Sequence, residues 1–501
     1  MSETVRIPEQ EIFSYHLGGK VGMEALKALT DQRSLSIAYT PGVARPCLAI
    51  REHPDDIFRY TSRGNLVAVV TDGTAVLGLG DIGPRASIPV MEGKAVLFKL
   101  FARIDAWPVP LEHCRTGGNS GPTDTERLVD TAASLACMYG GINLEDIAAP
   151  ACFAVEEQLQ ERVDCPVFHD DQWGTAIITL AGLKNYAYLA HKALEDLSVV
   201  INGAGAAGIR IAETIKNEGV RRILLVDSKG VIHDRRDDLN PYKTAFAAST
   251  SKRSLADAMQ NADVFIGVSV PRLVTPAMVR SMADYPAIFA MANPDPEITP
   301  EEVREAMGKR PYIMATGRSD YPNQINNVLG FPYIFRGALD VQAKRISPSM
   351  KRAAAESLAG VARLEAPDHV RAAYPDADLS FGPQYIIPKP FDHRLLVEVS
   401  LAVAEAACRE GNASITDLTF YRHYLEALAY APGGDARIPF IPERIARFGD
   451  LHTLCLGRTP DGNAGSFLFD PQDAIRLIND IPMPDSEITL HLKSGRIIGI
   501  D

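Results

Sequence analysis

Short apolar runs separated by amphipathic stretches dominate the middle of the chain. From residue 166 they read PVFHDD, SVVING, RILLVD, DVFIGVS, AIFAMANP and YIMATG. Runs of this length that alternate with helical stretches are typical of buried parallel strands. The pattern predicts an α/β fold with a doubly wound parallel sheet over residues 166–345. Polar residues would then gather at the carboxyl ends of its strands, where ligands bind in such sheets: Asp170, Asp171, Asp227, Ser269, Asn293 and Thr316.

Residues 1–165 show a less regular pattern, which predicts a mixed α/β domain. The segment from Asn65 to Gly80 reads as two strands around an Asp72-Gly73 turn and predicts a hairpin. A helix is expected from Pro89 onward. Another is expected to begin at the capping box between Thr123 and Glu126 and to end before two consecutive glycines at 140 and 141.

The last third of the chain contains two regions that differ in sequence pattern. Residues 346–431 show helical periodicity and are expected to pack back on the body. Residues 432–501 are broken by Gly, Pro and Asp, and their last run, EITLHLKSGRIIGID, alternates around a Ser494-Gly495 turn. We expect a small β-containing appendage there, of unknown role, for which a ligand-sensing module is one hypothesis.

A glycine-rich turn joins two of the predicted elements in the segment VVINGAGAAGIRIAETIKNEGVRRILLVD. Gly203 permits the tight turn, Gly205 lets the backbone approach a pyrophosphate, and Gly208 allows close packing of helix and strand. The helix amino terminus would face the phosphates. This context favours a Rossmann-type dinucleotide site over an ordinary glycine-rich turn. The loop consists of Gly203, Ala204, Gly205, Ala206, Ala207 and Gly208.

The acid that ends this segment leaves the choice of dinucleotide open. Asp227 lies 19 residues after Gly208 and could accept the ribose hydroxyls of NAD. Ser228 and Lys229 follow at once and could instead receive the 2′-phosphate of NADP. Both cofactors therefore remain candidates.

Composition excludes several classes of function. The chain has 501 residues with 51 basic and 63 acidic side chains, and a net charge of −12 argues against a nucleic-acid partner. Its seven cysteines are scattered and form no C-x-x-C pair, so neither disulfides nor zinc are indicated. No apolar stretch approaches the roughly 20 residues of a membrane span. We expect a cytoplasmic protein.

One lysine falls on the apolar stripe of a predicted helix. In PVMEGKAVLFKLF, Lys94 lies on the stripe, whereas Lys99 is about 140° away and should face water. An apolar wall disfavours the charged ammonium and lowers its pKa, which would make Lys94 a usable general base. The alternative is a lysine that extends along the wall to place its ammonium in water.

A tyrosine ends the alternating segment SLSIAYTPGVA. The alternation predicts that Tyr39 stands at a strand end, just before a turn at Pro41 and Gly42, where its hydroxyl could donate a proton. The alternative, a half-buried packing residue, is the commoner role for a tyrosine in such a position.

Two acidic doublets follow predicted structural breaks. Glu145 and Asp146 form one, and Asp170 and Asp171 form the other. Adjacent carboxylates repel unless a cation lies between them, and oxygen ligands suit Mg²⁺ or Mn²⁺. The alternative is that the second doublet caps a helix. The neighbouring His169 is expected to be structural.

These segments together resemble the malic enzymes, specifically the shorter bacterial type, over about residues 10–430. The similar segments are SLSIAYTPGVA, TDGTAVLGLGDIGPRASIPVMEGKAVLFK, GINLEDI, VFHDDQWGTA, the glycine loop, ANPDPE and ATGRSDYPNQINNVLGFPYIFRGAL. The resemblance implies oxidative decarboxylation of L-malate to pyruvate and CO₂ with NAD or NADP and a divalent metal. It also implies a homodimer or a larger assembly built from dimers.

The resemblance assigns roles to particular residues. Lys94 is expected to be the general base for the substrate hydroxyl, Tyr39 the general acid that protonates enolpyruvate, and Asp170 a proton relay or orienting partner. The metal ligands would be Glu145, Asp146 and Asp171. The groups expected to hold the substrate carboxylate or the nicotinamide side are Asn293, Asn327 and Asn326.

The chain also departs from the family pattern. Trp173 stands directly beyond the expected metal ligands, where a smaller or histidine-like residue is expected, and residues 113–125 form a longer connection. Three alternatives to a malic enzyme remain: a malolactic-type relative, a decarboxylase acting on oxaloacetate, and a metabolite-binding regulatory protein on the same scaffold. Net release of reduced cofactor from malate would separate the first two from a malic enzyme.

Overall fold

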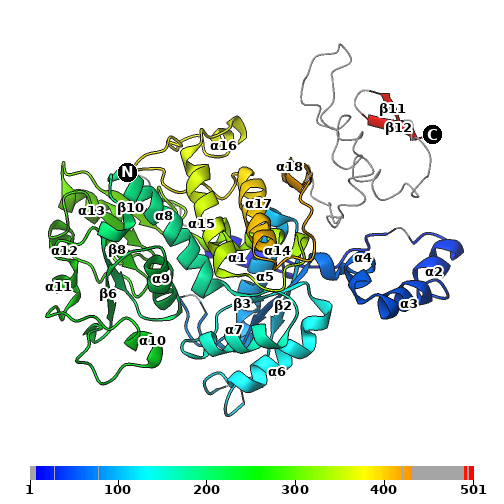
Figure 1. Cartoon of the computed structure of the whole chain (residues 1–501), viewed down its shortest axis with the longest axis horizontal. Helices are drawn as coiled ribbons and strands as arrows, with labels where there is room; N and C mark the ends of the chain where they lie inside the picture. The colour runs from blue at the N-terminus through cyan, green and yellow to red at the C-terminus, as the bar shows by residue number, and fades with distance from the viewer. Residues whose placement is uncertain are drawn as a thin grey trace.

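Two separate sheets, parallel except for one short edge strand, form the body of the protein (Figure 1). The computed structural model describes residues 7–430 except 28, 77, 119 and 420, together with the backbone of residues 490–493 and 496–500. The first sheet has the order β2-β1-β3-β4, and all its neighbouring strands are parallel. Its strands are β1 (Leu66–Thr71), β2 (Asp105–Pro110), β3 (Gly141–Leu144) and β4 (Val167–His169).

The second sheet confirms the predicted doubly wound arrangement. Its order is β10-β9-β8-β5-β6-β7, and only the short edge strand β7 is antiparallel. The strands are apolar along nearly their whole length because helices cover both faces. They are β5 (Ser198–Asn202), β6 (Arg222–Asp227), β7 (Gly230–Val231), β8 (Val264–Gly267), β9 (Ala287–Ala290) and β10 (Ile313–Thr316).

Helices surround each sheet. In the first domain α5 packs on β1 and β2 and α7 packs on β4, and these helices lie on opposite sides of the sheet (Figure 1). The helices of this domain are α5 (Gly83–Ala102), α6 (Thr125–Leu135) and α7 (Ala151–Arg162). Those of the second domain are α8 (Thr175–Leu189), α9 (Ala206–Asn217), α10 (Pro241–Thr244), α11 (Leu255–Met259), α12 (Pro276–Arg280) and α13 (Pro300–Met307).

The described part of the predicted return segment, residues 346–430, is largely helical. It packs on the body through contacts of α15 with α8 and of α17 with α14. Helix α14 (Phe331–Asp340) precedes the segment, and the helices of the segment itself are α15 (Pro348–Arg363), α16 (Asp368–Ala373), α17 (Arg394–Arg409) and α18 (Tyr421–Tyr430). Single turns complete the described chain: η1 (Pro54–Asp56), η2 (Ser62–Asn65), η3 (Ala136–Met138), the π-helical η4 (Asp170–Gly174), η5 (Leu194–Asp196) and η6 (Asn327–Leu329).

A buried polar network holds the return segment to the first domain. Arg336 on α14 donates to Asp340 Oδ2 at 2.9 Å and to Asn65 Oδ1 at 2.6 Å. The Tyr421 hydroxyl on α18 donates to the same Asp340 oxygen at 2.8 Å. A buried arginine requires such partners, because an unpaired charge away from water is costly. The network therefore ties α14 and α18 to the start of β1.

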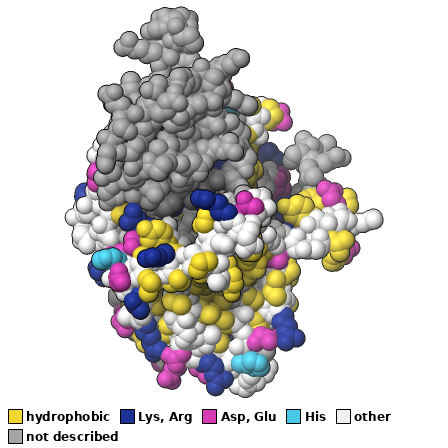
Figure 2. Space-filling view, turned by 90° about the vertical axis from the view of Figure 1, so that its right-hand side faces the viewer, with side chains coloured by type: hydrophobic (Ala, Val, Ile, Leu, Met, Phe, Trp, Pro, Cys, Tyr) yellow, Lys and Arg dark blue, Asp and Glu magenta, His cyan; other side chains and the backbone are white. Residues whose placement is uncertain are grey.

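An amino-terminal arm extends from the body (Figure 1). It consists of α2 (Gln32–Ala38), α3 (Ala44–Glu52) and α4 (Ile57–Tyr60), whereas α1 (Glu9–His16) lies apart from these three, in the middle of the view in Figure 1. None of the four helices buries a residue. Apolar side chains are exposed along it, Leu35, Ile37, Val43 and Leu48 among them. Figure 2 views the molecule from the side of this arm and shows hydrophobic side chains gathered there.

The predicted hairpin between Asn65 and Gly80 is wrong. Residues 66–71 form β1, but both edges of β1 are taken by parallel partners, β2 and β3. The following residues instead form a loop in which Val76 makes one isolated bridge to Gly80. Gly73, with a φ of +69°, makes the turn, and its carbonyl accepts from Gly83 N at 3.0 Å.

Several predicted boundaries also differ. The helix expected from Pro89 begins at Gly83, with Pro84 in the first turn where a proline needs no donor. The helix expected at a Thr123 capping box is capped instead by Asp124, whose side chain accepts from Arg127 N. The strand PVFHDD belongs to the first sheet, because β4 pairs with β3. The strands of the final hairpin are β11 (Leu490–Lys493) and β12 (Arg496–Ile500), which pair antiparallel as predicted. The predicted Ser494-Gly495 turn, residues 431–489 and residue 501 lie outside the described residues.

The segment around Tyr39 is helical rather than extended. Asp31 and Ser34 form a reciprocal capping box that starts α2, and Tyr39 is the residue that ends this helix. The alternating pattern therefore predicted the wrong structure. The capping box satisfies two backbone N–H groups and so favours the helix. No helix among residues 7–430 is long and apolar enough to cross a membrane.

Two glycines of the nucleotide turn should respond differently to substitution. A Cβ at Gly208 would overlap the carbonyl oxygen of Gly203, whereas a Cβ at Gly205 meets nothing within 4 Å. Gly208→Ala should therefore lower the midpoint of thermal unfolding by roughly 5 °C, because the strand and helix must separate. Gly205→Ala should leave it within about 1 °C. Calorimetry of both variants measures the difference, and equal midpoints would contradict the packing argument.

Candidate active site

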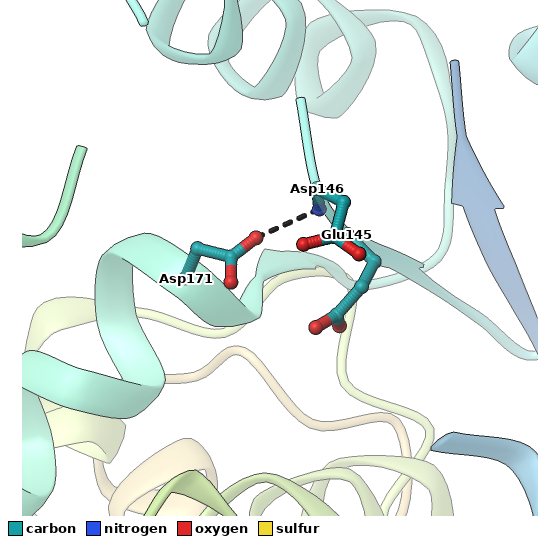
Figure 3. A group of neighbouring side chains, drawn as sticks. All are labelled: Glu145, Asp146 and Asp171. Atoms are coloured by element: carbon teal, nitrogen blue, oxygen red, sulfur yellow. Dashed lines mark hydrogen bonds between the residues drawn. The ribbon is translucent and has the colours of Figure 1, made fainter. Parts of the chain in front are cut away.

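Two neighbouring strands bring the acidic doublets together. Leu144 at the end of β3 pairs with His169 at the end of β4. Glu145 and Asp146 therefore emerge beside Asp170 and Asp171 at one edge of the first sheet. Figure 3 shows Glu145, Asp146 and Asp171 converging, with one oxygen from each lying within 4.8 Å of the others. The backbone amide of Asp146 donates to Asp171 Oδ2 at 2.8 Å and fixes the two loops together.

The electrostatics of this cluster favour a cation. Glu145 is 5% exposed, and its burial together with nearby carboxylates raises its pKa well above the ordinary value despite the neighbouring Lys94. Burial likewise raises the pKa of Asp171. Carboxylates buried against one another are stabilised by a positive charge, and hard oxygen donors match Mg²⁺ or Mn²⁺. The three carboxylates fit a divalent metal by their oxygen donors; Glu145 and Asp146 are buried, and Asp171 is partly exposed.

Lys94 reaches the same cluster from α5. Its Nζ donates to Asp170 Oδ2 at 2.6 Å and lies 3.0 Å from Glu145 Oε1 and 4.3 Å from the centre of the Phe331 ring. The predicted inward orientation is correct. The predicted direction of the pKa shift is wrong: burial lowers the pKa of Lys94, but Asp170, Glu145 and Asp171 outweigh it and raise the pKa. Without a metal, the side chain is an ammonium.

Lys99, the expected solvent-facing counterpart, is only partly exposed. Its Nζ lies 3.2 Å from Asp105 Oδ1 on β2. The geometry of the helix still separates it from Lys94, but β2 packs beside this face of α5. The expectation of a fully solvated lysine is therefore wrong, because a strand lies where the periodicity suggested water.

Asp170 connects the lysine to the second domain. Asn327 Nδ2 donates to Asp170 Oδ2 at 3.0 Å, and Thr175 Oγ1 donates to Asn327 Oδ1 at 3.1 Å. The side chain of Asn326 accepts from Val328 N at 2.9 Å and caps η6. Asn293 is exposed beyond β9. Thus Asn327 lies at the Lys94 cluster, whereas roles for Asn326 and Asn293 toward a substrate remain predictions.

The glycine turn has the backbone geometry expected of a dinucleotide cradle. Gly203 has a φ of +122°, and Gly205 is the residue before the first turn of α9 with open space around it. Ala204, Ala206 and Ala207 place only methyl groups on this surface, so backbone amides at the helix start stay accessible to phosphates.

The acid that ends β6 is surrounded by cations. Asp227 Oδ1 accepts from Arg236 Nη1 at 2.8 Å, and Oδ2 accepts from Lys243 Nζ at 2.7 Å. Partial burial raises the pKa of Asp227, but these hydrogen bonds outweigh it and hold the pKa at about 2. Ser228 and Lys229 are exposed, and Lys229 pairs with Asp238 at 2.7 Å. Sequence reasoning missed Arg236 and Lys243, because no periodic pattern connects them with Asp227.

Tyr39 does not join this site within one chain. Its side chain is 69% exposed at the end of α2, on the amino-terminal arm. Figure 1 shows α2 well away from the helices around the first sheet. The structure therefore brings together Lys94, Asp170 and the three carboxylates but not the tyrosine.

Trp173 and Arg115 have structural partners. Trp173 Nε1 donates to Glu156 Oε2 at 2.9 Å. Arg115, in the long connection, is 2% exposed and donates to Asp81 Oδ1 at 2.9 Å and to the Gly121 carbonyl at 2.6 Å, which folds residues 113–125 onto the loop after β1. His169 is buried, which lowers its pKa to about 4, and it is not part of the carboxylate group. It is therefore neutral at physiological pH.

Comparisons with known proteins agree with this arrangement. Residues 18–160 match the family model of the malic enzyme N-terminal domain, and residues 173–379 match that of the malic enzyme NAD-binding domain. The NADP-dependent malic enzyme of Halomonas elongata is 51% identical over 410 residues, which cover 81% of this chain and 94% of that protein.

Other relatives are longer or differ in cofactor. The NADP-dependent malic enzyme of Rhizobium meliloti is 51% identical over 84% of this chain, but the chain spans only 55% of its length. The crystal structure of the NAD-dependent malic enzyme of Thermotoga maritima is 40% identical, with a TM-score of 0.71 over 80% of this chain and 99% of that one. With both domain models matched in order and one relative covered almost completely, this chain belongs to the malic enzyme family.

Proposed function

We propose that this protein oxidises and decarboxylates L-malate to pyruvate and CO₂, with NAD(P)⁺ as the hydride acceptor and Mg²⁺ or Mn²⁺ as the metal. One observation carries the proposal: Lys94 contacts Glu145 and Asp170 beside a three-carboxylate cluster. The relatives named as NADP-dependent and NAD-dependent malic enzymes support it.

The metal would be held by Glu145, Asp146 and Asp171. When bound, a divalent cation would offset the negative charge that raises the pKa of Lys94 and would polarise the oxygen on C2 of the substrate. Asp170 is not assigned as a ligand, because its Oδ2 accepts from both Lys94 and Asn327. It instead orients the lysine amine toward the substrate.

Two proton transfers are assigned to two residues. Neutral Lys94 takes the proton of the 2-hydroxyl while hydride leaves C2 for the nicotinamide, which gives oxaloacetate. The C3–C4 bond then breaks, CO₂ leaves, and the electron pair forms enolpyruvate. Tyr39 donates a proton to C3 to give pyruvate. The transfers require different groups, because one removes a proton from oxygen and the other delivers a proton to carbon.

The tyrosine would come from a second copy of the chain. Tyr39 stands on the arm, whose helices bury no residue in their own chain and expose Leu35, Ile37 and Val43. Such a surface favours association with another protein surface. We therefore assign a homodimer, or an assembly of dimers, in which the arm of one copy completes the site of the other.

The cofactor assignment favours NADP. Both oxygens of Asp227 are engaged by Arg236 and Lys243, so its carboxylate is less available to the ribose hydroxyls of NAD. The two cations instead lie where a 2′-phosphate would be received, with Ser228 and Lys229 exposed beside them. In this role Asp227 holds the phosphate-binding cations in place.

The general-base assignment predicts a large loss of activity in Lys94→Ala. The turnover of L-malate with Mn²⁺ should fall by about a thousandfold, because proton removal from the hydroxyl loses its acceptor. Lys99→Ala, on the same helix, should stay within about twofold of the wild type. Absorbance of the released reduced nicotinamide measures both. Malate oxidation that persists with a chelator, or full activity in Lys94→Ala, would contradict the mechanism; lactate without released cofactor would indicate the malolactic alternative.

The shared site predicts complementation between two inactive variants. Tyr39→Phe and Lys94→Ala should each be nearly inactive alone. After unfolding and joint refolding at equal amounts, mixed dimers hold one complete site, so about a quarter of the wild-type activity should return. Refolding each variant alone is the control. Failure of the mixture to exceed the controls, while capture of an affinity tag on one variant retains the other, would place both residues in one chain.

The cofactor assignment predicts a selective loss with NADP⁺. Arg236→Ala and Lys243→Ala should each lower kcat/KM for NADP⁺ by about 10- to 100-fold, the effect of losing a charge-assisted hydrogen bond to phosphate. The value for NAD⁺ should change much less, and the exposed neighbour Arg235→Ala should alter neither. Steady-state assays with both cofactors provide the comparison. Equal losses for both cofactors would mean that the cations only support the fold.

A further inference from the structure

Arg210 lies on the helix that begins at the dinucleotide cradle. Helix α9 starts at Ala206, directly after Gly205, and Arg210 is four residues further along. This helix packs against η4, the five-residue turn that carries Asp170 and Asp171. Helix α9 therefore begins at the dinucleotide cradle and also contacts η4, which carries the proposed metal ligand Asp171.

A specific hydrogen bond connects α9 with η4. Arg210 Nε donates to Gln172 Oε1 at 2.8 Å, and Gln172 Nε2 donates to the Cys152 carbonyl at 3.2 Å. Gln172 is fully buried and is the residue immediately after Asp171. A movement of α9 would therefore be transmitted to the residue next to the metal ligand.

The same guanidinium also packs on the following residue. Its central carbon lies 4.7 Å from the centre of the Trp173 ring, and Lys351 Nζ lies 3.3 Å from that ring centre. Glu156 accepts the indole N–H. Two successive residues of η4 are thus held by Arg210, one by a hydrogen bond and one by a cation–π contact.

The remaining donors of Arg210 fix its own position. Nη1 lies 2.7 Å from Glu213 Oε2, and Nη2 lies 3.4 Å from Glu157 Oε1. A planar guanidinium can make these contacts and still direct Nε at Gln172, whereas a lysine ammonium cannot do both. The arginine is therefore a rigid link between α7, α9 and η4.

We propose that Arg210 is a positioning residue that couples dinucleotide binding on α9 to the placement of Asp171, so that dinucleotide and divalent metal each tighten the binding of the other. The inference rests on the proposed function, because it requires both ligands. The coupling is reciprocal by thermodynamic linkage. Its origin is mechanical: phosphates bound at the start of α9 fix the helix, the helix fixes Gln172 and Trp173, and these fix the turn that carries Asp171.

Mn²⁺ binding to the full-length protein tests this coupling. Free Mn²⁺ is measured by electron paramagnetic resonance with and without saturating NADP⁺, in the absence of malate. In the wild type NADP⁺ should tighten Mn²⁺ binding by roughly fivefold or more. In Arg210→Lys, which keeps the positive charge near Glu157 and Glu213, the tightening should fall below about twofold. Lys216→Met removes another basic residue of α9 and should retain the wild-type coupling.

Gln172→Met provides a second route to the same link, because it keeps the volume and removes the acceptor. It should also lose the coupling, and adding it to Arg210→Lys should have no further effect. Thermal unfolding of each variant checks that it is folded. Wild-type coupling in Arg210→Lys, or no coupling in a wild type that binds both ligands, would overturn the inference. A wild type that binds neither ligand would overturn the proposed function and this inference with it.

Discussion

The charge balance around the Lys94 ammonium is the interaction on which the site depends. Two adjacent strands deliver four carboxylates to one place, and a single ammonium reaches Glu145 and Asp170 among them. Burial makes this excess of negative charge unfavourable, because carboxyl groups that share a buried site raise each other's pKa. Three features hold this arrangement: the placement of α5, the pairing of β3 with β4, and the packing of α14 through Phe331. The excess of negative charge is also what makes it a cation site.

Much of the second domain was predictable, because its strands are buried on both faces and are therefore apolar throughout. The first sheet was less predictable from the sequence. The apolar run 66–71 identified β1, but an apolar run does not reveal which strands pair with it. Its true partners, β2 and β3, lie about 40 and 75 residues further along the chain. The D-G turn suggested a local hairpin, and two distant strands occupied both edges instead.

In the candidate site too, the features that depend on neighbouring residues were predictable, and those that depend on residues far apart in the sequence were not. The acidic doublets and the inward orientation of Lys94 could be read from spacing. The direction of the Lys94 pKa shift could not, because it depends on Asp170, 76 residues away. Arg236 and Lys243 around Asp227, and Arg210 beside Gln172, are likewise tertiary contacts. For Tyr39 the error was local, since the Asp31 and Ser34 cap was a readable helix signal that the alternating pattern obscured.

The amino-terminal arm has a thermodynamic consequence. Its three short helices bury no residue and gain little of the apolar burial that normally stabilises helices of this length. If a second copy covers Leu35, Ile37 and Val43, then ordering of the arm and association of the chains are one equilibrium rather than two. The stability of this part of the fold then depends on protein concentration as well as on sequence. Mass action would in that case govern how much of the protein is catalytically complete.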